Sequence, residues 1–561
     1  TGPNRQSVAF DKAGDKTIPF RITVGDKPGK STVRLTATGG GKSSVYETAI
    51  EIRSVATPVT ESKTFAIEPG KKISQKITMP GDAGTCSLAL ELSDMAPIDL
   101  SRHLRYLIGY PHGCIEQITS KAFPLLYLPK IAELTPEQKS TCQQAVMETI
   151  RRMRSYQTPD GAFAYWPGSL DGNGWGTVYA THFLTEAAAN GYNVPQALKS
   201  NALGNLRKMA SAWKRHSGYN AASEEQIQAY RLYVLALNGI ADKGAMNRLR
   251  EQSSLTPSSR YMLAMAYMLT GRKDIAAGLM NKTTELGYDY SRDLTFGSPL
   301  RDKSIVLLAL MAAGRDAEAM ALSNDIAREL SSSSWYSTQT TAFALMAAAK
   351  QAERTGQGEG LDLTYECGRV KGTVSTGKHV WSATIVENGK NTADLEIVNK
   401  GKATVMARTI ASGTVVGGIV SPASNGIELS VRYFDANGKE IDIEKMESGT
   451  YFTSVATVKN TSAVAVRNLV LSQIYPSGWE ILNTRYIQGG RDDKGLLSYQ
   501  DIRDDRVYSY IDELPAGKYV AVRINLCAVY SGRFYMPAAT CSAMYDAAIS
   551  SNTASASVVV E

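Results

Sequence analysis

Apolar and polar residues alternate along residues 17–92. The segments 20–24, 32–38, 48–53, 72–78 and 88–92 largely alternate apolar and polar residues, which is the period of a β-strand with one face toward solvent. Glycine and proline turns separate the segments, and Pro58 marks a boundary between two β units. The pattern predicts antiparallel sheet. The unit before Pro58 has too few strands for a sandwich, so we expect it to be part of a domain that begins upstream.

The period changes to that of helices between about residues 99 and 354. Apolar residues recur at three- and four-residue spacing, as on the buried face of an amphipathic helix. Proline after Thr135 and after Thr256 fits a first helical turn, and several glycines fit helix ends. The pattern predicts an array of helical hairpins with helices over 115–134, 136–156, 177–189, 195–213, 224–237, 258–269, 275–281, 304–313, 317–330 and 337–354.

Residues 361–560 return to the period of strands, with a strong hairpin signal at Asn437-Gly438. They are enough for one complete sandwich and a few additional strands. We therefore expect strands on both sides of the helical block to complete a single sandwich. Such an insertion costs little, because the two ends of an inserted domain usually lie close together.

Composition narrows the class of protein. A chain of 561 residues suggests three to four domains. With 20% charged and 43% hydrophobic residues and no apolar run long enough to span a bilayer, it is typical of neither disordered nor membrane proteins. The net charge of +7 is spread along the chain, so no nucleic-acid partner is expected. Six cysteines are too few for a disulfide scaffold, and the five histidines do not cluster at metal-ligand spacing. We expect no metal and no cofactor.

The chemistry is concentrated where strands give way to helices. The run there is Tyr110-Pro111-His112-Gly113-Cys114-Ile115-Glu116-Gln117. Proline and glycine impose a turn, and a helix begins near Cys114, whose thiolate the helix N-terminus should favour. Gln117 follows three residues later on the same face of the helix. Attack of the sulfur on the Gln117 carboxamide, with loss of ammonia, would form an internal thioester.

An isolated Cys-x-x-Gln usually marks a buried cysteine followed by ordinary helix residues. The wider context differs, because the run Pro-x-Gly-Cys-x-Glu-Gln opens a helical block that interrupts β units. This arrangement resembles the thioester motif of the alpha-2-macroglobulin and complement family, and it is most similar to the bacterial alpha-2-macroglobulins. The resemblance covers nearly the whole chain, including the loop at Asp160-Gly161 and Trp166, the helix at Trp335 and Gln339, and the late residues Gly532-Arg533-Phe534 and Met544-Tyr545.

The resemblance implies a multidomain α+β fold in which an α/α toroid, the thioester domain, is inserted into a β-sandwich and flanked by macroglobulin-like sandwiches. The boundaries that we predict are 1–56 for a partial macroglobulin-like sandwich, 57–97 and 358–418 for the two parts of a CUB-like sandwich, 98–357 for the toroid, and 419–561 for a C-terminal macroglobulin sandwich.

The function implied by the resemblance is that of a protease inhibitor and not of a turnover enzyme. Cleavage of a bait region elsewhere in the full protein would expose the Cys114–Gln117 thioester, and a lysine amine of the protease would then bind covalently to Gln117. The resemblance further implies a periplasmic or cell-envelope setting, a partner in cell-wall synthesis, and a membrane anchor in a region upstream of Thr1.

The sequence also suggests roles for residues near Cys114 and Gln117. His112 is either a surface turn residue or a base that assists amine attack. Glu116 either tunes the thiolate as a charged neighbour or favours the first helical turn, and we interpret it as the second. Tyr106 and Tyr110 are candidates for shielding the thioester from water. In complement relatives a histidine of a later helix directs the acyl group to hydroxyls, but residues 224–237 contain no histidine and offer Tyr230 and Tyr233. Acylation should therefore favour amines, with no role for His182 and His216, the histidines of the helical block that follow the motif.

Three alternatives stay open. One is a toroid enzyme acting on a polymer or an isoprenoid, although paired aspartates on one helix face are missing. The second is a cysteine hydrolase that uses Cys114 with His112 or Glu116, although a base two residues away is poorly placed to face the same sulfur. The third is an envelope adhesion or scaffold module with an incidental cysteine. The other cysteines are Cys86, Cys142, Cys367, Cys527 and Cys541, of which the last two could pair if they lie on adjacent strands.

Overall fold

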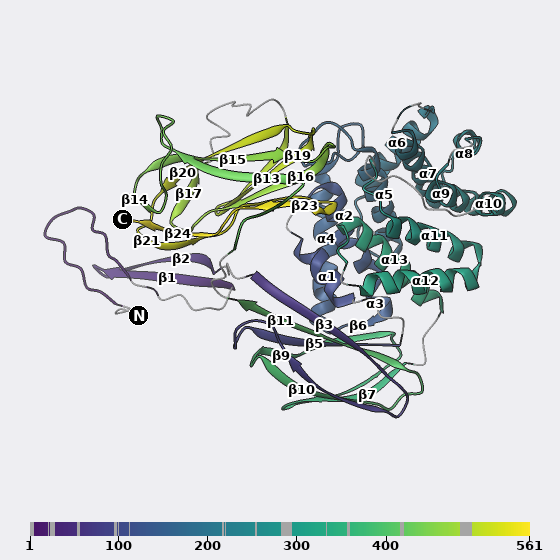
Figure 1. The fold of residues 1–561 in the computed structure, drawn as a ribbon, viewed down its shortest axis with the longest axis horizontal. Helices are drawn as coiled ribbons and strands as arrows, with labels where there is room; N and C mark the ends of the chain where they lie inside the picture. The colour runs from purple at the N-terminus through teal and green to yellow at the C-terminus, as the bar shows by residue number, and fades with distance from the viewer. Residues whose placement is uncertain are drawn as a thin grey trace.

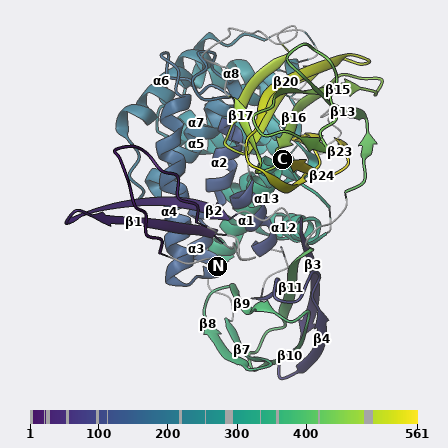
Figure 2. The ribbon, with the colours of Figure 1, turned by 90° about the vertical axis from the view of Figure 1, so that its left-hand side faces the viewer.

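The computed structural model describes residues 5–20, 22, 29–52, 57–94, 98, 100–110, 113–215, 218, 220–252, 255–281, 294–332, 334–355, 360–415, 420–482 and 496–561. The helical domain and a C-terminal sandwich lie side by side, and a second sandwich lies below them (Figure 1, Figure 2). Mixed α and β structure of this kind agrees with the fold predicted from the sequence. No helix in the described ranges is both long and apolar enough to cross a bilayer.

The helical domain is a closed ring. Within the described residues, contacts run from α2 to α5, α7, α9, α11 and α13 and back to α2, with shorter or more exposed helices outside. The helices are α1 Leu100–Gly109, α2 Ile115–Ala122, α3 Leu128–Ile131, α4 Pro136–Met153, α5 Gly174–Ala189, α6 Gln196–Ala212, α7 Ala221–Leu237, α8 Lys243–Arg250, α9 Pro257–Leu269, α10 Lys273–Met280, α11 Pro299–Ala313, α12 Asp316–Ser331 and α13 Thr338–Thr355.

Sequence pattern explains which helices lie inside. The inner helix α5 is buried on nearly every face, whereas the outer helix α4 buries one stripe that includes Cys142, Val146 and Ile150. A stripe at four-residue spacing is what a helix with one solvent face requires. The single helix predicted over residues 115–134 is wrong. α2 ends at Ala122, because Pro124 and then Pro129 cannot continue the hydrogen-bond ladder, and short turns follow.

The lower sandwich is built from both sides of the helical insertion. The strand β11, which follows the helices, pairs antiparallel with β3 and β5, which precede them. The predicted insertion of the toroid into a sandwich is therefore confirmed. The strands are β3 Thr57–Ile67, β4 Lys72–Thr78, β5 Cys86–Ser93, β6 Ala132–Glu133, β7 Leu361–Cys367, β8 Val370–Thr376, β9 Val380–Gly389, β10 Thr392–Asn399 and β11 Val405–Val415, in the orders β3-β11-β5-β9-β6 and β4-β10-β7-β8.

The C-terminal sandwich has its own core, which is separate from that of the helical domain. Its sheets have the orders β12-β23-β22-β16-β19-β18, β13-β15-β20-β17 and β14-β24-β21. The strands are β12 Ala423–Asn425, β13 Ile427–Phe434, β14 Lys445–Met446, β15 Tyr451–Asn460, β16 Val466–Ile474, β17 Trp479–Leu482, β18 Leu497–Ile502, β19 Arg506–Leu514, β20 Tyr519–Ala528, β21 Gly532–Met536, β22 Thr540–Ala543, β23 Asp546–Asn552 and β24 Ala556–Val560.

The N-terminal region contains one hairpin, β1 Gly29–Gly39 paired with β2 Lys42–Ile52. The third strand predicted over residues 20–24 is not observed at Phe20 and Ile22, which lie outside any strand, and the remainder of that segment is outside the described residues. The predicted domain boundaries stay predictions.

Candidate functional site

The N-terminus of α2 brings Cys114 and Gln117 together. Cys114 is the extended residue that precedes the helix, with φ −68° and ψ 165°. Its backbone N–H donates to the Gln117 side-chain oxygen at 3.1 Å, as in the capping box that closes many helix starts. This hydrogen bond folds the Gln117 carboxamide back toward the residue that carries the thiol. The exposed fractions are 0% for Cys114 and 2% for Gln117.

Loops of the helical domain fix this helix start. The backbone N–H of Ile115 donates to the carbonyl of Tyr165 at 3.0 Å, which satisfies a donor that the helix leaves free. The Tyr156 hydroxyl donates to the carbonyl of Gly113. A Cβ at Gly113 would lie 2.8 Å from the Arg152 guanidinium, so glycine suits the close packing there.

A turn of the C-terminal sandwich covers the pair. Met544 and Tyr545 form the turn between β22 and β23, called the 544–545 turn below. The Cys114 Sγ lies 3.8 Å from the Tyr545 hydroxyl, and the Gln117 amide nitrogen donates to the Met544 sulfur at 3.3 Å. The Tyr545 hydroxyl also lies 3.1 Å from that of Tyr165. Groups from two domains therefore enclose the site.

Aromatic rings surround the contact between the two domains. Trp166 stacks on Tyr499 with ring centroids 4.8 Å apart and packs on Tyr510 at 4.2 Å. Side chains alternate between the two faces of β19, which explains why the Tyr510 ring faces the helical domain. Val507 and Ile511 point into the core of the sandwich, whereas Tyr510 joins the cluster around Cys114. Both faces of this strand are thus buried.

Glu116 lies at the junction of the two domains. It is 0% exposed and accepts hydrogen bonds from Ser120 at 2.5 Å, Thr338 at 3.1 Å and Tyr545 at 2.7 Å. Burial raises the pKa of its carboxyl, and these three hydroxyls oppose the rise. The interpretation of Glu116 as a first-turn residue is incomplete, because its carboxyl also connects α2, α13 and the 544–545 turn.

The expected thiolate at Cys114 is wrong for the enclosed site. Burial, and after it the carboxylate of Glu116, raises the pKa of the thiol to about 12, although hydrogen bonds from Tyr165, the Gln117 backbone and Tyr545 oppose the shift. Removal from water therefore outweighs the helix N-terminus.

The other predicted residues divide into three groups. The Tyr106 and Tyr110 rings pack edge to face at 5.5 Å, and burial, followed by Tyr106, Glu116 and Cys114, raises the pKa of Tyr110. Pro111, His112 and His216 lie outside the described residues. His182 and Tyr230 contact each other at 2.7 Å inside the ring of helices, and Tyr233 packs beside them.

Several residues of the site were missed from the sequence. Met544 and Tyr545 supported the resemblance but were not predicted to contact Cys114, and Tyr165, Trp166 and Thr338 were not singled out for the site. The available signal was the apolar character of both faces of β16 and β19, which indicates strands buried on two sides. No local pattern could have identified the surface that they cover.

The described residues contain no group of three or more His, Cys, Asp or Glu side chains placed to hold a metal ion. All six cysteines are buried and free of disulfides. The suggested pair of Cys527 and Cys541 is not formed: both are free, and β20 and β22 are not adjacent strands.

Two family models match the chain. Residues 88–223 match the A-macroglobulin TED domain, and residues 426–547 match the bacterial alpha-2-macroglobulin MG10 domain. Alpha-2-macroglobulin of Escherichia coli K12 is 24% identical over 95% of this chain and 34% of its own length. The protein of the same name from Xylella fastidiosa strain Temecula1 is 25% identical over 97% of this chain and 35% of its own length. These matches support a C-terminal portion of a bacterial alpha-2-macroglobulin.

Solved bacterial alpha-2-macroglobulins have the same fold. Native E. coli alpha-2-macroglobulin spanning domain MG7 to the C-terminus superimposes with a TM-score of 0.78 at 21% identity, over 95% of this chain and 88% of that one. Salmonella alpha-2-macroglobulin reacted with methylamine gives 0.80 at 23% identity, over 95% of this chain and 36% of that one. The chain spans about a third of the length of the curated bacterial relatives, and it corresponds to their C-terminal part.

Proposed function

We propose that this chain carries the reactive part of a protease inhibitor that traps its attacker through a Cys114–Gln117 thioester. The hydrogen bond between the Gln117 side chain and the Cys114 backbone supports the proposal most directly, because it holds the carboxamide against the backbone of the residue that carries the thiol, and both residues are buried. The matches to the two family models support it independently. The alternatives of a toroid enzyme, a cysteine hydrolase and an adhesion module have no comparable observation in their favour.

The first proposed step is formation of the thioester. The Cys114 sulfur attacks the Gln117 carboxamide carbon, a C–S bond forms, the C–N bond breaks, and ammonia leaves with the thiol proton. Burial raises the pKa of the Cys114 thiol, so the nucleophilic thiolate is scarce in the enclosed site at pH 7. We therefore expect the bond to form during folding, before the 544–545 turn covers the cysteine and raises its pKa.

Acylation of the attacker is the second step. Bait cleavage in the full protein withdraws the C-terminal sandwich, and an amine nitrogen, typically of a lysine on the protease, attacks the carbonyl carbon. An amide bond to Gln117 forms, the C–S bond breaks, and the amine proton neutralises the sulfur. Each molecule acts once. Because His182 is engaged with Tyr230 inside the ring, we expect amines to react and hydroxyl compounds such as glycerol to remain unreacted.

The proposal extends to the setting of the whole protein. By analogy with the family, we place it in the periplasm or cell envelope, held there by an anchor upstream of this chain, with attacking proteases as covalent partners and a cell-wall synthesis protein as a further partner.

Mass spectrometry tests the thioester. The purified chain should be lighter than its sequence by one ammonia, should incorporate methylamine at Gln117, and should then present one additional free thiol at Cys114. The variants Cys114→Ala and Gln117→Ala should lose both properties, whereas Cys142→Ala should keep them. An intact mass equal to the sequence mass, with no uptake of methylamine, would overturn the proposal.

A further inference from the structure

Backbone strain is concentrated beside the 544–545 turn. Among the described residues, two that are not glycine have positive φ, namely Phe296 at 51° and Asn468 at 53°. Asparagine tolerates this left-handed conformation, but a bulky residue such as phenylalanine rarely adopts it. Both residues contact the turn. The Phe296 ring stacks on that of Tyr545 at 4.7 Å, and the carbonyl of Asn468 accepts from the Met544 N–H at 2.9 Å.

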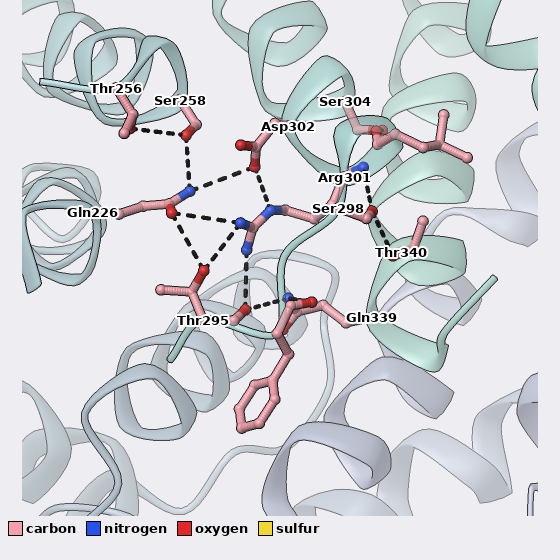
Figure 3. Close-up of polar contacts among 12 residues, drawn as sticks. Gln226, Thr256, Ser258, Thr295, Ser298, Arg301, Asp302, Ser304, Gln339 and Thr340 are labelled. Atoms are coloured by element: carbon pink, nitrogen blue, oxygen red, sulfur yellow. Dashed lines mark hydrogen bonds and ion pairs between the residues drawn. The ribbon is translucent and has the colours of Figure 1, made fainter. Parts of the chain in front are cut away.

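A buried polar network holds Phe296 in place (Figure 3). The Gln339 side chain donates to the carbonyls of Thr295 at 2.7 Å and Phe296 at 3.1 Å. Arg301, whose exposed fraction is 0%, donates to the Thr295 carbonyl at 3.1 Å and to its hydroxyl at 3.0 Å. Strained conformations persist only where the surroundings enforce them, and they are typical of functional sites.

The network is itself firmly anchored. Arg301 is paired with Asp302 at 2.5 Å, and its guanidinium lies over the Trp175 ring at 4.9 Å. The Trp175 indole donates to the other end of the Gln339 amide at 2.5 Å. A fully hydrogen-bonded buried network of this kind is rigid, so Phe296 is presented at a fixed position.

The Phe296 ring contacts the tyrosines that cover Cys114. The ring stacks on that of Tyr165, with centroids 5.6 Å apart, as well as on that of Tyr545. The hydroxyls of these two tyrosines contact each other, and that of Tyr545 contacts the Cys114 sulfur. Phe296 therefore packs against both tyrosines that close the site, Tyr165 and Tyr545.

We propose that Phe296 is a positioning residue that holds Tyr545 over Cys114 and thereby limits how often the site opens before cleavage. This inference rests on the proposed function for its biological meaning, because it describes the regulation of the same site. Its structural part concerns only the access of small molecules to Cys114.

The test measures that access without requiring a thioester. In a Gln117→Ala background Cys114 is a free thiol, and its alkylation by iodoacetamide can be followed by peptide mass spectrometry. We expect Phe296→Ala to accelerate alkylation about three- to tenfold, the range for loss of an aromatic pair. Phe296→Tyr, which keeps the ring, should leave the rate unchanged. So should the control Tyr192→Ala, which removes a half-buried ring of the helical domain near Cys142.

A double-mutant cycle separates positioning from general destabilisation. If Phe296 acts through Tyr545, Phe296→Ala should have no further effect in a Tyr545→Ala background. Equal rates for wild-type Phe296 and Phe296→Ala, or full additivity in the cycle, would overturn the inference. Should Phe296→Ala fail to fold, Asn468 gives a second comparison. Asn468→Gly keeps the left-handed backbone and should not change the rate, whereas Asn468→Val should increase it.

Failure of the proposed function would look different. In that case the chain with Gln117 intact would show no loss of ammonia and no uptake of methylamine, whatever residue stands at 296. The alkylation rates in the Gln117→Ala background would still decide the role of Phe296.

Discussion

Glu116 shows how much one buried side chain adds to a site defined by its neighbours. Cys114 and Gln117 are the residues between which a bond is proposed, but the carboxyl of Glu116 meets hydroxyls from two helices and from the C-terminal sandwich. A typical hydrogen bond contributes about 0.5–1.5 kcal/mol. The contact with Tyr545 therefore adds to what keeps the two domains together.

The raised pKa of Glu116 predicts a pH dependence of stability. Below about pH 4.5, its ordinary pKa, the carboxyl is protonated in both the folded and the unfolded chain. As the pH rises, the unfolded chain ionises first, so the folded state loses about 1.4 kcal/mol for each unit by which folding raises the pKa. The loss is complete once the pH exceeds the folded pKa.

Urea denaturation of wild type and Glu116→Gln across pH 4–8 isolates this contribution. The free energy of unfolding of wild type minus that of the variant should fall as the pH rises above 4.5 and then level off. A difference that grows with pH would mean that the three hydroxyls outweigh burial and that the carboxylate is the stabilised form.

At the residue scale, the sequence predicted which residues form the site better than it predicted their surroundings. Cys114 and Gln117 were found because spacing along a helix is a local property. The pKa of Cys114 was misjudged because its largest determinant is burial, and the residues that bury it include Tyr545, more than 400 positions further along the chain.

Close packing between helices positions the start of α2. Gly176 on α5 lies against Ile115, the residue that follows Cys114. A Cβ at position 176 would lie 2.5 Å from a methyl group of Ile115 and 3.0 Å from the Asn173 side-chain oxygen that caps α5. The absence of a side chain there is thus part of the geometry of the site.

We expect Gly176→Ala to lower the free energy of unfolding by about 1–3 kcal/mol, as overpacking usually does, and to displace α2. Displacement should also reduce the fraction of molecules that lack one ammonia by intact mass. Gly204→Ala on α6 is the matched control. It meets no atom within 4 Å and should stabilise the chain by about 0.5–1 kcal/mol through helix propensity. A neutral Gly176→Ala would contradict this account of the packing.

At the element scale, most helices and strands followed from periodicity, and the errors have local causes. The overlong helix after Cys114 ignored Pro124 and Pro129, which stop α2. Alternation predicted strands within residues 361–560, but it did not indicate what the second face of β19 would meet. Tyr508 and Tyr510 pack there against the helical domain rather than facing water.

The arrangement of whole domains makes the reactivity of Cys114 depend on residues of the C-terminal sandwich. Tyr510→Ala removes the ring that packs on Trp166 at 4.2 Å without touching the core of its own sandwich. We expect this variant to take up methylamine about three- to tenfold faster than wild type. Tyr519→Ala, at a position where the side chain is 61% exposed, should react at the wild-type rate. Equal rates for the two variants would show that the aromatic contact between the domains does not limit access.

The split sandwich also determines how the molecule responds to a pulling force. The first residue of β3 pairs with the last residue of β11, Thr57 with Val415, and the ladder runs from there to Ile67 and Val405. Tension applied between the chain before β3 and the chain after β11 therefore loads one end of the ladder, and its hydrogen bonds break one after another rather than together. A force between these two points would separate β3 from β11 at low load. The ring of helices that contains Cys114 does not carry this force.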